Sequence, residues 1–263
     1  MLIALGKIQT GYNEITNMDG MGAEMLMDIG ICKIPAGEKV SFLEEEKETA
    51  FSLYDGEVEF NWEGNARLVN RTSLFDENPT VLHVCKGIQV VLTAKTDVEI
   101  LIQRTRNDME FSSVFYAASD CRSDIFGENV WGDTAKRVVR TVFDYHNAPY
   151  SNMVLGEVIN APGKWSSYIP HGHEQPEVYY YRFDRKQGFG AGFIGDEVYK
   201  IVDNSALCIP GGPTHPQVTA PGYAMHYTWM IRHYENNPWI DRVNDPDHEW
   251  LLDPNADIWS PKG

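Results

Sequence analysis

Two stretches of this chain decide its fold and its chemistry: His171-Gly172-His173-Glu174-Gln175-Pro176-Glu177 and Ile209-Pro210-Gly211-Gly212-Pro213-Thr214-His215. In an extended segment, side chains at alternate positions share a face, so His171, His173 and Glu177, all at odd-numbered positions, project together. The prolines and glycines of the second stretch predict a tight turn between two strands. A returning antiparallel strand would then bring His215 opposite the other three side chains.

These four side chains form a set of metal ligands. Neutral imidazoles with one carboxylate suit Zn²⁺, Mn²⁺, Fe²⁺, Ni²⁺ or Co²⁺ and leave coordination positions open for a substrate. The plainer interpretation makes His171 and His173 surface histidines of a polar loop and His215 a turn residue. The order of all four ligands along the chain and the turn before His215 favour instead one divalent metal ion per chain. The other histidines lack such partners and are predicted to be packing or surface residues: His83, His146, His226, His233 and His248.

Most of the remaining chain has the pattern of short β-strands separated by turns. The segments Thr80–Cys85, Ile88–Ala94 and Val98–Arg104 are rich in Val, Ile, Leu or Thr. Within Ala50–Trp62, Asp55-Gly56 predicts a tight turn and hence a hairpin. Many short strands at close spacing predict an all-β barrel or sandwich.

The second half of the chain repeats the plan of the first. Ala36-Gly37-Glu38-Lys39-Val40-Ser41-Phe42 parallels Pro162-Gly163-Lys164-Trp165-Ser166-Ser167-Tyr168, 126 residues later, which indicates a duplication. At this offset the ligands fall on Glu45, Lys47, Phe51 and, with an adjustment of one residue, Val90, so the first half has no comparable ligand set. We therefore predict a metal-free N-terminal barrel (residues 1–106), a connecting segment (107–150) and a C-terminal barrel with the metal site and an aromatic tail (151–263).

Two further segments carry weaker signals. Lys136, Arg137 and Arg140 cluster in the connecting segment, where we interpret them as a solvated surface, with contacts in a homo-oligomer as the alternative. The tail from Asn236 onward is too aromatic for a disordered segment. We expect it to pack on a barrel through Trp239, Trp250 and Trp259.

The motifs between Gly163 and His215, Gly…His-x-His-x-x-x-Glu and Pro-x-Gly-x-x-His, resemble the two signature motifs of the cupin superfamily. A narrower resemblance, spanning nearly the whole chain, is to the 5-deoxy-glucuronate isomerase family of myo-inositol breakdown. The segments that carry it are Lys164-Trp165-Ser166-Ser167-Tyr168, Pro170-His171, Pro176-Glu177-Val178-Tyr179-Tyr180-Tyr181-Arg182-Phe183, Gln187-Gly188-Phe189 and Ala220-Pro221-Gly222-Tyr223.

This resemblance implies a bicupin fold, with two tandem β-barrels, and a metal-dependent aldose–ketose isomerase that needs no organic cofactor. Its reaction would convert 5-deoxy-glucuronate, a sugar acid, to 2-deoxy-5-keto-gluconate. Typical members of the family carry a longer acidic insertion between the second His and the Glu, where this chain has only Glu174-Gln175-Pro176. Because that loop rims the pocket, a related uronate is the second candidate substrate.

The residues after Glu177 include the candidates for catalysis. Tyr179 and Tyr181 continue the odd-numbered face and are expected to point into the barrel, whereas Tyr180 and Arg182 point away. The alternative is that the tyrosines only fill the core and have no catalytic role. Isomerisation moves a proton between neighbouring carbons, for which Glu177, Tyr181 and a metal-bound hydroxide are candidates, with Tyr181 favoured over Tyr179. The candidates for binding the substrate carboxylate, none of them favoured, are Arg182, Lys164, Lys200 and Arg232.

Composition limits the remaining function classes. The 263 residues are 43% hydrophobic and 23% charged, which is ordinary for a globular protein. A net charge of −16 argues against binding nucleic acid or an anionic membrane. Four dispersed cysteines and the lack of a signal-peptide pattern or a long apolar run predict a cytoplasmic protein with reduced thiols. Two alternatives stay open: an iron-dependent cupin dioxygenase, which would consume O₂, and a non-catalytic sugar-binding cupin.

Overall fold

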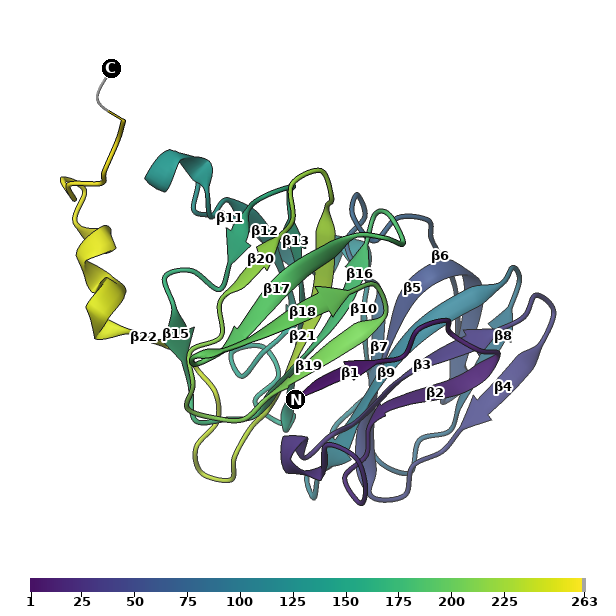
Figure 1. Ribbon diagram of the computed structural model, residues 1–263. Helices are drawn as coiled ribbons and strands as arrows, with labels where there is room; N and C mark the ends of the chain where they lie inside the picture. Colours follow the sequence, from purple (N-terminus) through teal and green to yellow (C-terminus); the bar gives the residue numbers. More distant parts are fainter. Residues whose placement is uncertain (262–263) are drawn as a thin grey trace.

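The computed structural model describes residues 1–261 and consists mainly of β-strands, curled into two assemblies that lie side by side (Figure 1). The first assembly is a nine-stranded sheet with the order β10-β7-β5-β9-β3-β2, joined by β4, β6 and β8. Its strands are β2 (Gly11–Thr16), β3 (Asp28–Ile34), β4 (Lys39–Phe42), β5 (Lys47–Trp62), β6 (Asn65–Arg71), β7 (Val81–Val84), β8 (Val90–Ala94), β9 (Val98–Arg106) and β10 (Val114–Tyr116).

The second assembly combines a seven-stranded sheet, β1-β19-β16-β21-β13-β12-β11, with a four-stranded sheet, β14-β20-β17-β18, and the short pair β15-β22. Its strands are β1 (Leu2–Ala4), β11 (Arg122–Phe126), β12 (Arg137–Phe143), β13 (Met153–Asn160), β14 (Trp165–Ser166), β15 (His171–Gly172), β16 (Glu177–Phe183), β17 (Phe189–Ile194), β18 (Glu197–Val202), β19 (Ser205–Ile209), β20 (Gln217–Thr219), β21 (Met225–Arg232) and β22 (Val243–Asn244). Four short 3₁₀ helices complete the described elements: η1 (Ala23–Met25), η2 (Ala118–Asp120), η3 (Trp131–Asp133) and η4 (Pro246–Leu252).

The hairpin predicted at Asp55-Gly56 is wrong, because β5 runs through this dipeptide without turning back. The register shifts between Leu53 and Asp55, and the strand changes partners there, from β9 before the shift to β8 and β6 after it. Gly56 has a φ of 92°, and a Cβ on it would lie 2.2 Å from the carbonyl oxygen of Asp97. The glycine therefore permits a bulge that bends one long strand across the barrel.

Three apolar cores follow from the alternation of side chains along the strands. One fills the first assembly and includes Phe51 and Val90, the positions that match two of the metal ligands. A second fills the C-terminal assembly and includes Tyr179 and Tyr181. The third lies between the assemblies and receives Tyr180 from the opposite face of β16. The inward orientation predicted for Tyr179 and Tyr181 is therefore confirmed.

Strand pairing crosses the predicted segment boundaries. β1, at the very start of the chain, pairs with β19 of the C-terminal assembly, with Leu2 opposite Leu207. Within residues 107–150, β10 pairs with β7 of the first assembly, whereas β12 pairs with β13 of the second. A division of the chain into two duplicated barrels stays a prediction, which superposition of residues 25–105 on residues 155–235 would test.

The basic cluster of the connecting segment was predicted to be a solvated surface, and this prediction is wrong for Arg137 and Arg140, two of its three members. Arg137 and Arg140 are each only 5% exposed. Arg140 donates to the carbonyl oxygens of Leu74 and Phe75 and lies 3.3 Å from Glu157, which also forms a bidentate ion pair with Arg71 at 2.8 Å. These buried charges join the two assemblies, an arrangement that a count of charges along the sequence does not reveal.

The tail packs on the C-terminal assembly through its first part, and η4 is contacted by Trp131, whose Nε1 donates to the carbonyl oxygen of Leu251 at 3.1 Å. Trp239 contacts Trp229 of β21, at a ring-centroid distance of 5.8 Å, and β22 pairs with β15. Farther along, the tail with η4 extends away from the sheets (Figure 1), and Trp250 and Trp259 are 51% and 82% exposed. The packing predicted for these two tryptophans is therefore wrong.

Among the helices within residues 1–261, none is both long and apolar enough to cross a bilayer.

Candidate metal centre and its cavity

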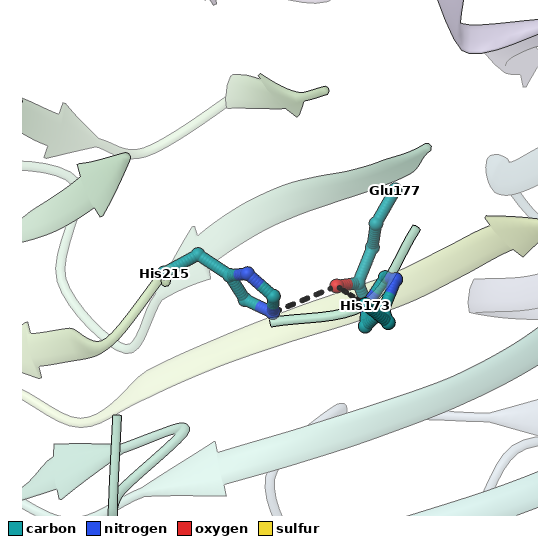
Figure 2. A group of neighbouring side chains, drawn as sticks. All are labelled: His173, Glu177 and His215. Atoms are coloured by element: carbon teal, nitrogen blue, oxygen red, sulfur yellow. Dashed lines mark hydrogen bonds and ion pairs between the residues drawn. The ribbon is translucent and has the colours of Figure 1, made fainter. Parts of the chain in front are cut away.

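The structure brings together three of the four predicted ligands. His173 lies in the loop between β15 and β16, Glu177 begins β16, and His215 follows the turn after β19. One ligand atom from each of these side chains lies within 4.8 Å of the others. The Nε2 atoms of His173 and His215 each lie 3.2 Å from Oε2 of Glu177, as the dashed lines in Figure 2 mark.

Close backbone contacts explain the glycines between these ligands. A Cβ on Gly172 would lie 2.5 Å from the carbonyl oxygen of Gly212, and one on Gly211 would lie 1.7 Å from that of Glu174. The amide of Gly212 also donates to the carbonyl oxygen of His173 at 2.7 Å. The glycines thus let the two ligand-bearing segments approach closely enough to place His173 beside His215.

The imidazoles are oriented by backbone carbonyl groups. Nδ1 of His171, His173 and His215 lies 2.7, 2.9 and 3.0 Å from the carbonyl oxygens of Ile169, Gln175 and Pro213. A carbonyl oxygen only accepts a hydrogen bond, so each Nδ1 carries a proton, and Nε2 is the ring atom whose lone pair can bind a metal ion. This is the arrangement found around metal-bound histidines.

The lone pairs and the carboxylate would repel one another without a positive charge between them. His173 and His215 can face Oε2 of Glu177 only as imidazolium ions or as ligands of a shared cation. Burial raises the pKa of Glu177, but the two imidazoles that face its carboxylate outweigh this effect and lower the pKa to about 2. An ionised carboxylate that is faced by two Nε2 atoms therefore fits a divalent metal ion.

His171 lies beside this group without belonging to the tight cluster. Its ring centroid is 5.4 Å from that of His215, and its side chain lines the same cavity. Burial, followed by His215 and Arg242, lowers the pKa of His171 to about 3, which keeps the imidazole neutral. It is thus in a state that can bind metal, at the edge of the three-residue group.

A cavity of about 520 Å³ opens beside the ligands. Alternate side chains of β12, Arg137, Val139 and Thr141, form one wall, and residues 239–242 of the tail form another. The pairing of β22 with β15 holds this part of the tail next to His171. The volume is in the range of small-molecule sites.

The two candidate tyrosines occupy different places. Tyr179 lines the cavity, and its hydroxyl lies 3.2 Å from Oγ of Ser167. Tyr181 is fully buried and does not line the cavity; its hydroxyl donates to Oε1 of Gln217 at 2.6 Å. Burial raises the pKa of both phenols well above its ordinary value, so each is a hydrogen-bond donor near neutral pH rather than a base.

None of the four basic residues considered for the substrate carboxylate lines the cavity. Arg182, which points away from the barrel as expected, forms ion pairs with Glu99 and Asp203, and Arg232 donates to Thr105. The sequence analysis did not consider as carboxylate partners the three arginines that do line it, Arg122, Arg137 and Arg242. A usable signal was the alternation of Arg137, Val139 and Thr141, which puts all three on one face of β12.

The curled sheets and the His/Glu group inside one of them define a protein of the cupin class. The structure resembles the crystal structure of an IolB-like protein from Salmonella typhimurium, with a TM-score of 0.86, 18% identity, and coverage of 95% of this chain and 98% of that one. It also resembles the oxalate decarboxylase of Lactobacillus farciminis, solved as a formate complex, with a TM-score of 0.67, 11% identity, and coverage of 96% and 90%. The predicted all-β cupin fold is confirmed.

The chain belongs to the KduI/IolB family, whose sequence model matches residues 2–251. A relative from Bacillus licheniformis named 5-deoxy-glucuronate isomerase is 27% identical over 199 residues, covering 70% of this chain and 71% of that protein. One of the same name from Shouchella clausii is 26% identical over 220 residues, with 76% of each chain covered. The family resemblance drawn from the motifs is confirmed.

Proposed function

We propose that this protein is a metal-dependent aldose–ketose isomerase that converts 5-deoxy-glucuronate, or a related uronate, to the corresponding ketose. Isomerase activity agrees with the names of the curated relatives. The observation that carries metal dependence is the set of three imidazoles whose Nδ1 atoms are engaged by carbonyl groups, two of them with Nε2 atoms facing Glu177. We propose His171, His173, Glu177 and His215 as the ligands.

The bound divalent ion, Zn²⁺, Mn²⁺, Fe²⁺, Ni²⁺ or Co²⁺, would supply positive charge that stabilises negative charge on the substrate oxygens. The reaction removes a proton from the carbon beside the aldehyde and returns one to the aldehyde carbon, with no net oxidation. Glu177 is held ionised and is one candidate proton acceptor, but as a ligand it would have to leave the metal ion to take up the proton.

The tyrosines have separate proposed roles. Tyr179, with a neutral hydroxyl at the cavity wall, would donate a hydrogen bond to a substrate oxygen as charge develops there. Tyr181 is better suited to positioning: it holds Gln217, whose amide donates to the carbonyl oxygen of His215 at 2.8 Å. Tyr181 would then act through the placement of a ligand.

The deciding experiment combines elemental analysis of the purified protein with an NMR assay of 5-deoxy-glucuronate, with and without oxygen. We expect about one divalent ion per chain and isomerisation that is independent of O₂. The variant His215→Ala should lose both metal and turnover, whereas His248→Ala, on η4, serves as the control and should retain them.

Three results would contradict the proposal: turnover that persists in the metal-free protein, product formation that requires O₂, and sugar binding without isomerisation in metal-replete protein. The second would indicate the dioxygenase and the third a binding protein. With other uronates as substrates, the same assay identifies which sugar acid the short Glu174-Gln175-Pro176 loop admits.

A further inference from the structure

Arg137 is a buried cation without an acidic partner. It lines the cavity with 5% exposure, and no carboxylate within residues 1–261 lies at ion-pair distance from it. It donates to the carbonyl oxygens of Ala135 and Tyr168 at 2.9 and 3.1 Å. A guanidinium has five N–H donors, so three remain available.

Such a charge is costly to bury alone. Burial, the largest cause, and the nearby Arg242 lower the pKa of Arg137. Buried charges are generally paired, because removing a charge from water without a partner costs several kcal/mol. An unpaired guanidinium at a cavity wall therefore suggests that its counter-ion arrives with a ligand.

A second cation lies close to the first. The guanidinium carbons of Arg137 and Arg242 lie 5.6 and 5.9 Å from the ring centroid of Phe126. Arg242 is exposed on the tail, next to β22. The third arginine of the cavity, Arg122, differs because Asp124 and Asp144 lie 3.2 and 3.5 Å away and neutralise it. Positive charge is thus concentrated around Arg137 and Arg242.

Two indole rings that carry unpaired donors also line this cavity. The Nε1 atoms of Trp229 and Trp239 are buried and have no hydrogen-bond partner within the described part of the chain. Trp229 itself is 8% exposed, and both rings line the cavity. Indole N–H groups and guanidinium groups only donate, so the complementary ligand is anionic and rich in oxygen acceptors.

We propose that Arg137, assisted by Arg242, forms a carboxylate-binding subsite that holds the acid end of the sugar while the carbonyl end lies at His173, Glu177 and His215. This assignment rests on the proposed function for the identity of the substrate. The fork of Arg137 can bind a carboxylate through two parallel hydrogen bonds. The subsite would select sugar acids over neutral sugars and orient the chain of carbons across the cavity.

The opposing interpretation is that Arg137 is purely structural and ties β12 to the backbone at Tyr168. The two carbonyl bonds alone would then account for it. The interpretations differ in one measurable property, which is discrimination between a carboxylate and a neutral group of the same size.

The test uses D-glucuronate and D-glucuronamide, which differ only in that group, with binding measured by calorimetry on metal-replete protein. We expect the wild type to bind the acid about 10- to 100-fold more tightly, the range of a charge-assisted hydrogen-bonded pair. Arg137→Gln should bring the ratio to within about threefold, and Arg242→Gln should reduce it partly. Lys164→Gln, outside the cavity, is the matched control and should keep the wild-type ratio.

Metal content measured on each variant shows whether the ligand cluster is intact. If Arg137→Gln does not fold, the exposed Arg242→Gln variant still decides, because a structural Arg137 gives no reason for Arg242 to affect acid discrimination. An unchanged ratio in a folded Arg137→Gln variant, or a wild type without preference for the acid, overturns the subsite. Discrimination that depends on Arg137 without any isomerisation would refute the proposed function while supporting the subsite.

Discussion

The variants Tyr179→Phe and Tyr181→Phe test the separate roles proposed for the two tyrosines. Tyr179 would contact the substrate directly, whereas Tyr181 would act by positioning a metal ligand. Tyr179→Phe keeps the ring, which lies 5.9 Å from that of His215, and removes the only group of this side chain that can donate a hydrogen bond. Loss of a positioned donor or acid typically costs at least about 10²-fold in rate, which corresponds to about 2.7 kcal/mol in the activation free energy. We expect that fall in kcat for Tyr179→Phe, with metal content unchanged.

Tyr181→Phe should behave differently. It leaves Oε1 of the fully buried Gln217 without its hydrogen-bond donor at 2.6 Å, a loss that costs about 1–3 kcal/mol of folding free energy. Because Gln217 still donates to the carbonyl oxygen of His215, we expect kcat to fall by less than about tenfold.

The assay pairs NMR-monitored turnover with urea unfolding for both variants. A 10²-fold loss in Tyr181→Phe together with nearly unchanged turnover in Tyr179→Phe would refute the reasoning. It would restore Tyr181 as the residue next to the reacting carbons.

Three further predictions concern the buried charges and the metal. Glu157→Gln should lower the free energy of unfolding by about 3–5 kcal/mol, because Arg71 and its partners keep their buried charge. Glu59→Gln, in the more exposed pair with Lys95, should have a much smaller effect on the same quantity. Urea titrations that give equal losses for the two variants would contradict this prediction. Burial alone would raise the pKa of Glu157, but Arg71 holds it well below its usual range, so its contribution to stability is present above a pH of about 4.3, the unfolded value, and is lost as the pH falls below it. The free energy of unfolding of Glu157→Gln should therefore fall less steeply with decreasing pH than that of the wild type. An unchanged pH dependence in the variant would contradict this role of Glu157. Removing metal with a chelator should lower the melting temperature and abolish turnover, and adding back a divalent ion should restore both; His173→Ala should show no such response.

Some of the site could be predicted because its residues are close in sequence. Even spacing places Glu177 and Tyr179 on one face of β16, and the glycines at Gly172 and Gly211 mark where two backbones touch. The single strand expected from His171 to Glu177 is interrupted, because bends at Glu174 and Gln175 bring His173 to Glu177 from a loop. The same spacing rule failed at Asp55-Gly56, where a local turn signal is equally compatible with a bulge. A dipeptide specifies backbone conformation, whereas the partner strands decide whether the chain reverses.

The cavity walls illustrate the limits of local patterns. Nothing in the sequence near Arg137 indicates that Tyr168 and Arg242 lie beside it, since these contacts depend on the pairing of β12 with β13 and of β22 with β15. For the same reason the charge cluster of the connecting segment was assigned to the surface. Burial is a property of the packed sheets and not of a run of charges.

The sequence by itself determined the cupin class and the family through the resemblance of its motifs, and it predicted four candidate ligands because short-range alternation and turn chemistry act within a few residues of each other. Only the tertiary structure decided that Tyr179 rather than Tyr181 lines the cavity, that β1 completes the sheet of the C-terminal assembly, and that Arg137 has no acidic partner among residues 1–261. These features arise where segments far apart in the chain meet, and their energies depend on which groups are excluded from water together.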